Sequence, residues 1–461
     1  MARIIVIGAG VAGLAAAARM ASGVNEVTIV ERNPSPGGGA VTWAGPHTLT
    51  LPAVLRDLFI KTGGRRSGSS GTLEDVVDLR PVDPVRRFVF PDGTGLDLPN
   101  AARGATKDAF DVAFGPGSGE AWLRVLDHGN RAWSAIRPAL VEVPDAGRTE
   151  LWRLLRSASA RRALAPRRTL RQIGAEAGVR DPRMLRVLDD YALGAGADPA
   201  DAPAVLTIRP YIEHAFGAWR VVGGMTELVT AMYERCVARG VAFRFGAEAS
   251  AVAAGGVTLA DGERLDADVI VAAVDAHVLG SLTGERRRAV AYSPSAFCVR
   301  LAVDEPTAAA VELPHETVLF GARGGPGEPG GRTIRVHVAP EKPREWVATV
   351  TAKRDESDAD ATAMAMALSK ELAHRLGVPS DGLTVAAVLT PADFERLTGT
   401  PGGSLHGPVA DSLSSAILRS PTVQPIKGLL HIGGSARPGP GLAFAALGAW
   451  NAAEVLKPTR V

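Results

Sequence analysis

Three glycines near the start of the chain have the spacing Gly-x-Gly-x-x-Gly. Gly8, Gly10 and Gly13 follow the apolar run 4–7 and overlap the start of an alanine-rich stretch that continues over 14–20. The apolar run suits a strand buried in a parallel sheet, and the alanine-rich stretch favours a helix. In such a turn the first glycine allows the sharp bend, the second lets the backbone approach a pyrophosphate, and the third lets helix and strand pack closely. The pattern therefore predicts a dinucleotide site at a helix N-terminus.

An acidic residue ends the next predicted strand. The apolar run 27–30 is followed by Glu31, at the position where dinucleotide-binding proteins place an acid that accepts hydrogen bonds from a ribose. A carboxylate there repels a 2′-phosphate and disfavours NADP. Arg32 and a second glycine cluster, which includes Gly38 and Gly39, come next. A second close approach of the backbone suits a larger dinucleotide, FAD, whose other half lies further along the chain.

The composition narrows the remaining classes of protein. The chain has 461 residues, enough for two domains with large cores, and its net charge of +2 gives no global sign of nucleic-acid binding. Its two cysteines, Cys236 and Cys298, cannot build a disulfide framework or a four-cysteine metal site, so we expect no metal. Neither an H-E-x-x-H zinc motif nor a G-x-S-x-G nucleophile elbow occurs in the sequence.

The sequence carries no signal for export or membrane insertion. The first predicted strand begins at residue 4, with no charged and apolar leader in front of it. No uninterrupted apolar run reaches the length of about 18 residues that is needed to cross a bilayer. We therefore expect a cytoplasmic protein without a signal peptide or a transmembrane helix.

Hydrophobic periodicity predicts the elements that position these residues. Residues 86–98 predict two short strands about an Asp92–Gly93 turn, and residues 105–190 predict mainly helices. Four strands separated by turn signals follow over residues 296–352 and predict an antiparallel sheet. The Gly/Ser-rich stretch 61–75 predicts a flexible loop.

The expected fold class is α/β, with two interleaved domains. A Rossmann-type FAD-binding domain comprises residues 1–65, 219–290 and 420–461, because the strands that suit a parallel sheet fall in these segments. A substrate domain comprises residues 66–218 and 291–419, and combines the antiparallel sheet with helices that include a helical cap.

Several ordered sequence blocks resemble those of one protein family. After the N-terminal glycine motif come AGPHTLTLP, VDPVRRFVFPDG, GADPADAPAVLTIRPYIEHAFGAWRVVGGM, PGGSLHG and LLHIGGSARPGPGLAFAALGAWNAAEVL. Together they resemble the phytoene desaturase (carotenoid desaturase) branch of the FAD-dependent, amine-oxidase-like oxidoreductases. The resemblance runs almost from end to end of the chain.

This resemblance implies positions for the cofactor FAD. The N-terminal glycines would hold its pyrophosphate, Glu31 would hold the adenosine ribose, and Ala249 would meet the adenine through its backbone. Four residues of the closing block would lie along the ribityl chain and the isoalloxazine: Gly433, Gly434, Gly441 and Leu442. A helix that begins near Gly441 would set its positive end at the electron-rich edge of the flavin.

The chain departs from the family pattern at four places. Gly39 stands where the family has an arginine, His47 where it has a serine, Arg437 where it has a histidine, and Pro440 lies between two glycines of the family's GgG block. His47 and Arg437 would flank the flavin, where Arg437 would stabilise the anionic reduced flavin or tether a phosphate or a carboxylate. All of these departures except Gly39 bear on the substrate more than on the cofactor.

One carboxylate is a further catalytic candidate. Glu213 lies in a matching block, and would act as a base or charge stabiliser, or as a structural carboxylate paired with Arg209 or Arg220. Three histidines are expected to be structural rather than catalytic: His214, His337 and His431.

The reaction that the resemblance implies is dehydrogenation, or desaturation, of a hydrophobic isoprenoid or polyene. The flavin would accept a hydride, a base or solvent would take the proton, and oxygen or a quinone would reoxidise the flavin. A flavin-dependent oxidase or isomerase of a non-carotenoid metabolite is an alternative. A prenyl-lipid carrier without redox chemistry is an alternative from another class.

A basic stretch of the sequence could contact a membrane surface. From Arg148 to Arg171 the sequence holds eight arginines against one acid, with Trp152 among them. A basic helix with tryptophan and leucine can lie on an anionic membrane, which would give this protein a peripheral contact with the inner face of the membrane. A solvated cap helix is the alternative.

Overall fold

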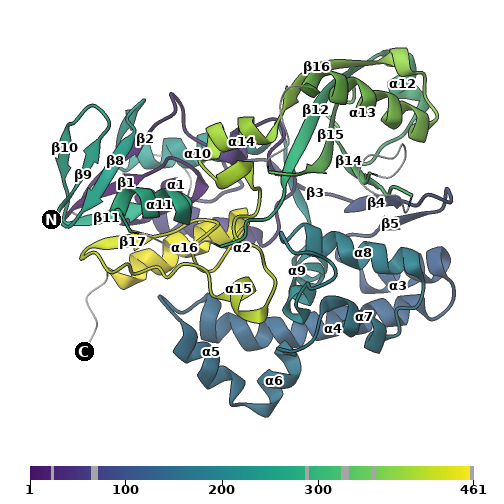
Figure 1. Ribbon diagram of the computed structural model, residues 1–461, viewed down its shortest axis with the longest axis horizontal. Coiled ribbons are helices and arrows are strands. Elements are labelled where there is room, and N and C mark those ends of the chain that lie inside the picture. The colour runs from purple at the N-terminus through teal and green to yellow at the C-terminus, as the bar shows by residue number, and fades with distance from the viewer. Residues whose placement is uncertain (22–24, 64–70, 286–289, 323–331, 355–359, 457–461) are drawn as a thin grey trace.

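The computed structural model describes residues 1–21, 25–63, 71–285, 290–322, 332–354 and 360–456 (Figure 1). Within the loop expected over residues 61–75, residues 64–70 lie outside the described residues, and so does the proposed domain boundary at residue 65; residues 61 and 62 are still helical. Among the described residues, no helix is both long and apolar enough to cross a bilayer.

A five-stranded parallel sheet carries the N-terminal glycine motif. Its order is β17 (Leu429–His431), β11 (Val269–Ala272), β1 (Arg3–Ile7), β2 (Glu26–Glu31) and β7 (Ala242–Phe245). Strand β1 lies in the middle, so the turn that follows it opens at the centre of the sheet edge. The strands come from three separate parts of the chain, and the expected α/β class is confirmed.

Both faces of this sheet are covered, which explains its continuous apolar strands. Ile4 and Val6 of β1 pack into a core with helices α1 (Val11–Met20), α10 (Met225–Ala238) and α16 (Leu442–Val455). Ile5 and Ile7 point to the other face, where they meet a second core. That core includes α11 (Ala276–Thr283) and a small antiparallel sheet of β8 (Ala249–Ala253), β9 (Gly256–Leu259) and β10 (Arg264–Asp266).

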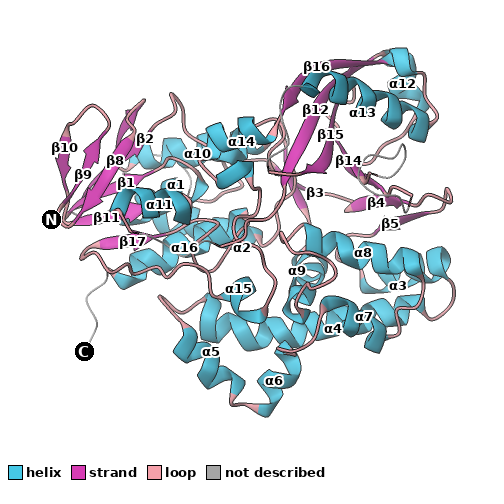
Figure 2. Ribbon diagram, viewed as in Figure 1, coloured by secondary structure: helices cyan, strands magenta, loops and turns pink. Residues whose placement is uncertain are grey.

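A second, seven-stranded sheet lies at the upper right of Figure 2. Its order is β16 (Leu383–Leu389), β12 (Ser295–Val303), β15 (Glu345–Ala352), β14 (Ile334–Val338), β13 (Glu316–Leu319), β4 (Arg86–Val89) and β5 (Gly95–Leu98). The four predicted strands over 296–352 are antiparallel, and the predicted hairpin over 86–98 is present. The sequence did not indicate that this hairpin joins the same sheet, through the parallel pair β4–β13.

Helices between residues 103 and 216 lie below this sheet in Figure 2, in agreement with the helical prediction. They are α3 (Arg103–Phe114), α4 (Ser118–Ile136), α5 (Arg148–Leu155), α6 (Ala158–Leu164), α7 (Leu170–Ala177), α8 (Pro182–Leu193) and α9 (Ile208–Phe216). Helix α4 is the longest of them, and its buried face carries Trp122, Leu126 and Trp133. These side chains link α4 to two cores, one under the sheet and one beside α16.

Shorter elements connect these parts. The helices are α2 (Pro52–Thr62), α12 (Glu305–Ala310), α13 (Ala361–Leu376), α14 (Pro391–Thr398) and α15 (Leu413–Ile417). Strands β3 (Leu79–Pro81) and β6 (Trp219–Val221) pair antiparallel to each other.

Candidate functional site

The N-terminal glycine turn has the geometry of a phosphate cradle. Gly8 has a φ of 100°, and a Cβ at Gly13 would lie 1.9 Å from the carbonyl oxygen of Gly8, so neither position accepts a side chain. A Cβ at Gly10, in contrast, would meet no atom of the described residues within 4 Å beyond its chain neighbours. No described side chain caps α1, which leaves the first N–H groups of the helix for a ligand. This open, uncapped turn fits a pyrophosphate.

Glu31 lies at the end of β2 beside this turn. It is buried, and its Oε2 accepts a hydrogen bond of 2.6 Å from the Ala9 N–H, while its Oε1 accepts one of 2.9 Å from the Asn33 N–H. Because each carboxylate oxygen has a second lone pair, the group can still accept hydrogen bonds from ribose hydroxyls. The backbone therefore holds the carboxylate next to the phosphate cradle.

The second glycine cluster packs directly against the first. The Gly37 N–H donates to the Ala9 carbonyl oxygen over 2.9 Å, and Gly37 forms an isolated parallel bridge with Gly10. A Cβ at Gly38 would lie 3.7 Å from the Cα of Gly10. Two glycine-rich segments separated by a strand thus line one cradle, which suits a ligand larger than a single phosphate group.

Gly39 and Arg32 contact helix α14. A Cβ at Gly39 would lie 3.3 Å from Cγ2 of Thr398, and Arg32 donates through Nη2 to the Arg396 carbonyl oxygen over 2.8 Å. Arg32 therefore ties the loop after β2 to α14.

Ala249 begins β8, next to the end of β2. The Ala247 N–H donates to the Glu31 carbonyl oxygen over 2.9 Å, and the Gly246 N–H donates to the Asn33 carbonyl oxygen over 3.2 Å. These hydrogen bonds place the segment that precedes β8 beside Glu31, the residue expected to bind the adenosine ribose.

The closing block lies on the other side of the N-terminal turn. The Ile432 N–H donates to the Ala272 carbonyl oxygen over 3.0 Å, which extends the pairing of β17 with β11. A Cβ at Gly433 would meet no described atom within 4 Å beyond its chain neighbours, whereas one at Gly434 would lie 3.8 Å from Pro440. Gly441 has a φ of 123° and precedes α16, which starts at Leu442 without a described side-chain cap and packs against α1.

Arg437 of the closing block points toward the segment before α5. Its Nε donates to the Arg419 carbonyl oxygen over 3.2 Å, and its Nη1 donates to the carbonyl oxygens of Asp145, over 3.4 Å, and Ala146. The Asp145 carboxylate lies 3.9 Å from the same Nη1. This guanidinium thus contacts three backbone carbonyl oxygens and one carboxylate.

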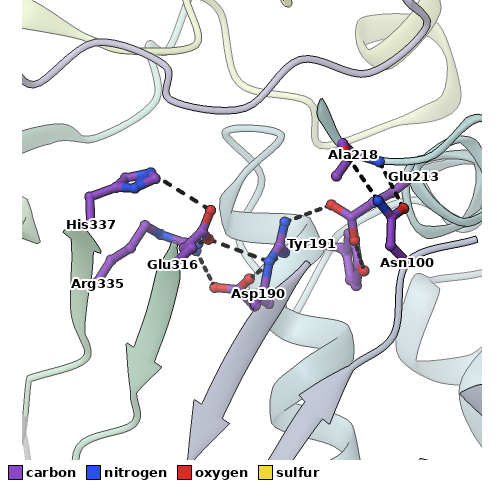
Figure 3. Close-up of polar contacts among 9 residues, drawn as sticks. Asn100, Asp190, Tyr191, Glu213, Ala218, Glu316, Arg335 and His337 are labelled. Atoms are coloured by element: carbon purple, nitrogen blue, oxygen red, sulfur yellow. Dashed lines mark hydrogen bonds and ion pairs between the residues drawn. The ribbon is translucent and has the colours of Figure 1, made fainter. Parts of the chain in front are cut away.

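Glu213 is held in a buried polar network, shown in Figure 3. Its Oε2 accepts a hydrogen bond of 2.6 Å from Arg86 Nη2, and its Oε1 accepts one from the Tyr191 hydroxyl. The carboxylate is therefore paired, but the arginine that hydrogen-bonds it is neither Arg209 nor Arg220, the two expected partners. Arg220 pairs with Glu341, and Arg209 is a half-buried charge nearby. The actual partner, Arg86, lies 127 residues earlier in the chain.

The network continues into the seven-stranded sheet (Figure 3). Arg86 Nη1 lies 3.2 Å from an Asp190 oxygen, and its Nε lies 3.3 Å from a Glu316 oxygen. Arg335 pairs with the same two acids, at 2.6 Å from Asp190. The network therefore fastens helices α8 and α9 to strands β4, β13 and β14.

His47 lies in a cluster of three histidines. Its ring centroid is 3.5 Å from that of His337, and its carbonyl oxygen lies 3.2 Å from Nε2 of His315, a residue that sequence reasoning missed. Burial and, next, the nearby His315 lower the pKa of His47 to about 3, and burial lowers the pKa of His337 well below its usual value. Both rings are therefore neutral at pH 7. The described residues contain no group of His, Cys, Asp and Glu side chains arranged to hold a metal ion.

The fold and this doubly glycine-lined cradle define a flavin-dependent oxidoreductase. Residues 11–334 match the family described as flavin containing amine oxidoreductase, which covers more than half of the chain. The chain belongs to this family, its cofactor is FAD, and the resemblance drawn from the sequence blocks is confirmed.

Curated relatives cover nearly the whole chain. The chain is 26% identical to a 4,4'-diapolycopene oxygenase of Methylomonas sp, over 96% of each chain. It is 28% identical to a hydroxyneurosporene desaturase of Rubrivivax gelatinosus, over 98% of this chain and 93% of the relative. It is 31% identical to an all-trans-zeta-carotene desaturase of Myxococcus xanthus, over 69% of this chain and 62% of the relative.

Solved structures share the fold. An oxidoreductase from Methanosarcina mazei has a TM-score of 0.60 at 15% identity and covers 98% of this chain and all of its own. A putrescine oxidase bound to putrescine has a TM-score of 0.61 at 14% identity, with 99% of each chain covered.

Proposed function

We propose that this protein is an FAD-dependent dehydrogenase that desaturates a hydrophobic isoprenoid or polyene substrate. The observation that carries the proposal is the contact of the two glycine clusters at Gly10 and Gly37, which forms an open cradle for a dinucleotide. The names of the curated relatives, which are desaturases and an oxygenase of polyenes, supply the substrate class.

The residues around the cradle would hold FAD in an extended form. Gly8, Gly10 and Gly13 would bind the pyrophosphate, Glu31 the adenosine ribose and Ala249 the adenine. Six further residues would line the cofactor: Arg32, Gly38, Gly39, Gly433, Gly434 and Leu442, with Gly441 starting the helix that faces the flavin. When bound, the isoalloxazine supplies the acceptor for the hydride.

Desaturation also needs an acceptor for a proton, and His47 is the best placed of the three catalytic candidates. Its imidazole is neutral at pH 7 and has a free lone pair, but the burial that lowers its pKa to about 3 also makes it a weak base, so solvent is the alternative acceptor of the proton. The segment between the second glycine cluster and His47 folds back on that cluster, since a Cβ at Gly45 would lie 2.8 Å from the carbonyl oxygen of Gly39. Glu213 and Arg437 have their polar atoms directed to partners within the protein, which favours structural roles for both.

We further propose that α5 and α6 bring the protein to an anionic membrane surface, where a polyene dissolves. The indole of Trp152 is 71% exposed, and five arginines around it are exposed: Arg153, Arg156, Arg161, Arg162 and Arg167. An exposed tryptophan among arginines suits an interfacial helix. Oxygen or a membrane quinone would then reoxidise the flavin.

Product analysis tests the proposed reaction. Purified, flavin-loaded protein would be given phytoene and shorter polyenes, and the products separated and weighed by mass spectrometry. A product lighter by two hydrogens per step supports the proposal. A product that gains oxygen would instead indicate an oxygenase, the activity named for the Methylomonas relative. A polyene that is bound but recovered unchanged would indicate a carrier.

A further inference from the structure

We propose that Arg437 is a latch that holds the helix pair α5–α6 closed over the start of α16, and that contact with an anionic bilayer opens it. This inference rests on the membrane contact proposed above. It connects the membrane-facing helices α5 and α6 to the segment that precedes α16, where the flavin is proposed to bind.

The latch joins two segments that are distant in sequence. Arg437 belongs to the closing block, four residues before Gly441 and the start of α16. Its guanidinium reaches the carbonyl oxygens of Asp145 and Ala146, just before α5 begins at Arg148. The Val423 N–H also donates to Oδ1 of Asp145, over 3.2 Å. The entry to α5 is thus fastened by polar contacts from the C-terminal part of the chain.

Apolar packing holds the pair by one face only. In α5, Leu151 is buried and Leu154 and Leu155 pack partly buried against the same core, while Trp152 and Arg153 point into solvent. The following helix α6 buries two alanines and Leu164. The polar contacts of Arg437 add to this one-sided packing at the entry to α5, so their loss should lower the free-energy cost of opening that end of the pair.

An apolar core lies directly beneath the pair. Leu151 and Leu164 share this core with Ala443 of α16, and the rings of Trp133 and Phe444 lie 6.3 Å apart in it. Moving the pair outward would expose apolar surface that continues to the first turn of α16. A hydrophobic substrate would find there a route from the membrane-facing helices to the proposed flavin site.

We expect attraction to an anionic bilayer to pull α5 and α6 away from Arg437. Anionic headgroups attract the exposed arginines of the pair, and Trp152 gains a place at the interface. Arg437 itself is half-buried in the closing block, so it stays with the body of the protein when the pair moves. Release therefore requires its contacts with Asp145 and Ala146 to break.

Hydrogen–deuterium exchange of the FAD-loaded protein tests the latch without any substrate. The variant Arg437→Gln keeps a polar side chain but loses the guanidinium, and we expect amides 145–151 to exchange at least tenfold faster than in the wild type. Arg183→Gln is the matched control, because Arg183 also pairs with a carboxylate, that of Asp181, on a different helix. We expect the control to leave amides 145–151 unchanged. Equal exchange of these amides in wild type and Arg437→Gln would overturn the latch.

Vesicles test the opening step. Phosphatidylglycerol vesicles should raise the exchange of amides 145–147 in the wild type toward the level of Arg437→Gln, and phosphatidylcholine vesicles should not. No increase with wild type that pellets with phosphatidylglycerol vesicles would refute opening by the bilayer. Wild type that does not pellet would refute the membrane contact and this opening step with it, whereas the comparison without vesicles would still decide the latch. Neither result depends on whether a polyene is the substrate.

Discussion

At the scale of single residues, the glycines of the N-terminal turn have different reasons to be glycine. Gly13 is required by the fold, because a Cβ there would overlap the carbonyl oxygen of Gly8. Gly10 has an ordinary backbone, with φ of −73° and ψ of 178°, and open space beside it. The spacing predicts both positions, but only the structure separates the packing role from the ligand-facing role.

Gly10→Val should therefore abolish FAD retention without unfolding the protein. A branched side chain is compatible with the backbone at this position, yet it fills the space that a pyrophosphate would occupy. The ratio of flavin to protein absorbance measures retention, and circular dichroism measures the fold. Gly13→Val is the contrasting variant and should lose its fold as well as its flavin. Normal flavin content in Gly10→Val would contradict the assignment of the cradle.

Buried histidines should make the protein sensitive to acid. Burial lowers the pKa of several of them, to about 3 for His47 and His406 and to about 4 for His128. The unfolded chain binds protons below its usual histidine pKa near 6.5, while the folded chain does not, so stability falls as pH falls from about 6.5. Each such group contributes up to about 1.4 kcal/mol per pH unit.

Urea unfolding at pH 7 and pH 5 measures this effect. We expect a lower midpoint at pH 5, and a smaller difference between the two midpoints for His128→Asn, since Asn keeps a donor near the Thr207 hydroxyl but does not titrate. A midpoint that is equal or higher at pH 5 would contradict the burial of neutral rings.

Residue roles that depend on distant partners could not be predicted. The spacing of the N-terminal glycines and Glu31 is a local signal, so the cradle follows from the sequence. The pairing of Glu213 with Arg86 joins residues 127 positions apart, and no local pattern marks it. The cluster of His47 with His315 arises in the same way, across 268 positions.

At the scale of elements, the polar network fastens the helices to the seven-stranded sheet. Arg86 alone contacts three carboxylates, those of Asp190, Glu213 and Glu316. Without Arg86, these three buried carboxylates lose positive charge. Arg335 contacts Asp190 and Glu316, so it could compensate for only part of the loss. The network is therefore more sensitive to loss of Arg86 than to loss of an exposed arginine.

Arg86→Leu should destabilise the protein by about 3–5 kcal/mol, the typical cost of breaking a buried ion pair from one side. Arg103→Leu, which removes an exposed pair with Asp127, is the control and should have little effect. The free energy of unfolding in urea is the measurement. Similar values for the two variants would show that the network is not held as the structure has it.

The basic helix pair should bind anionic membranes through its arginines. Replacing Arg161, Arg162, Arg167 and Arg168 by Gln should weaken binding by about 1 kcal/mol per residue near the surface. Added salt should weaken wild-type binding as the Debye length drops below about 8 Å. Co-sedimentation with phosphatidylglycerol vesicles checks both effects, and flavin content should not change. Equal pelleting of wild type and variant at low salt would leave a solvated cap as the correct interpretation.

Periodicity predicts elements better than it predicts their partners. The apolar run of β1 is continuous because both faces of its sheet are covered, and that local pattern sufficed to identify a parallel strand. The β4–β5 hairpin was also predicted, but its place beside β13 depends on a pairing across more than 220 residues. Such long-range register leaves no trace in local spacing.

At the scale of the whole molecule, three separate chain segments build one parallel sheet. The two glycine clusters and the closing block follow strands β1, β2 and β17, so they all lie at the edge where these parallel strands end. The seven-stranded sheet and the helices below it form the rest of the molecule (Figure 1). We propose the interleaved boundaries given above for the two domains. This arrangement places the cofactor cradle against α14 of the second part, through Arg32 and Gly39.

Anaerobic reduction of the bound flavin by a polyene tests the central claim most directly. The FAD-loaded protein is mixed with phytoene in vesicles under nitrogen, and absorbance near 450 nm is followed together with the mass of the polyene. We predict that the flavin bleaches with loss of two hydrogens from one polyene per flavin, and that air restores the yellow colour. Flavin that stays oxidised with phytoene and with shorter polyenes, in protein shown to bind them, would contradict the account.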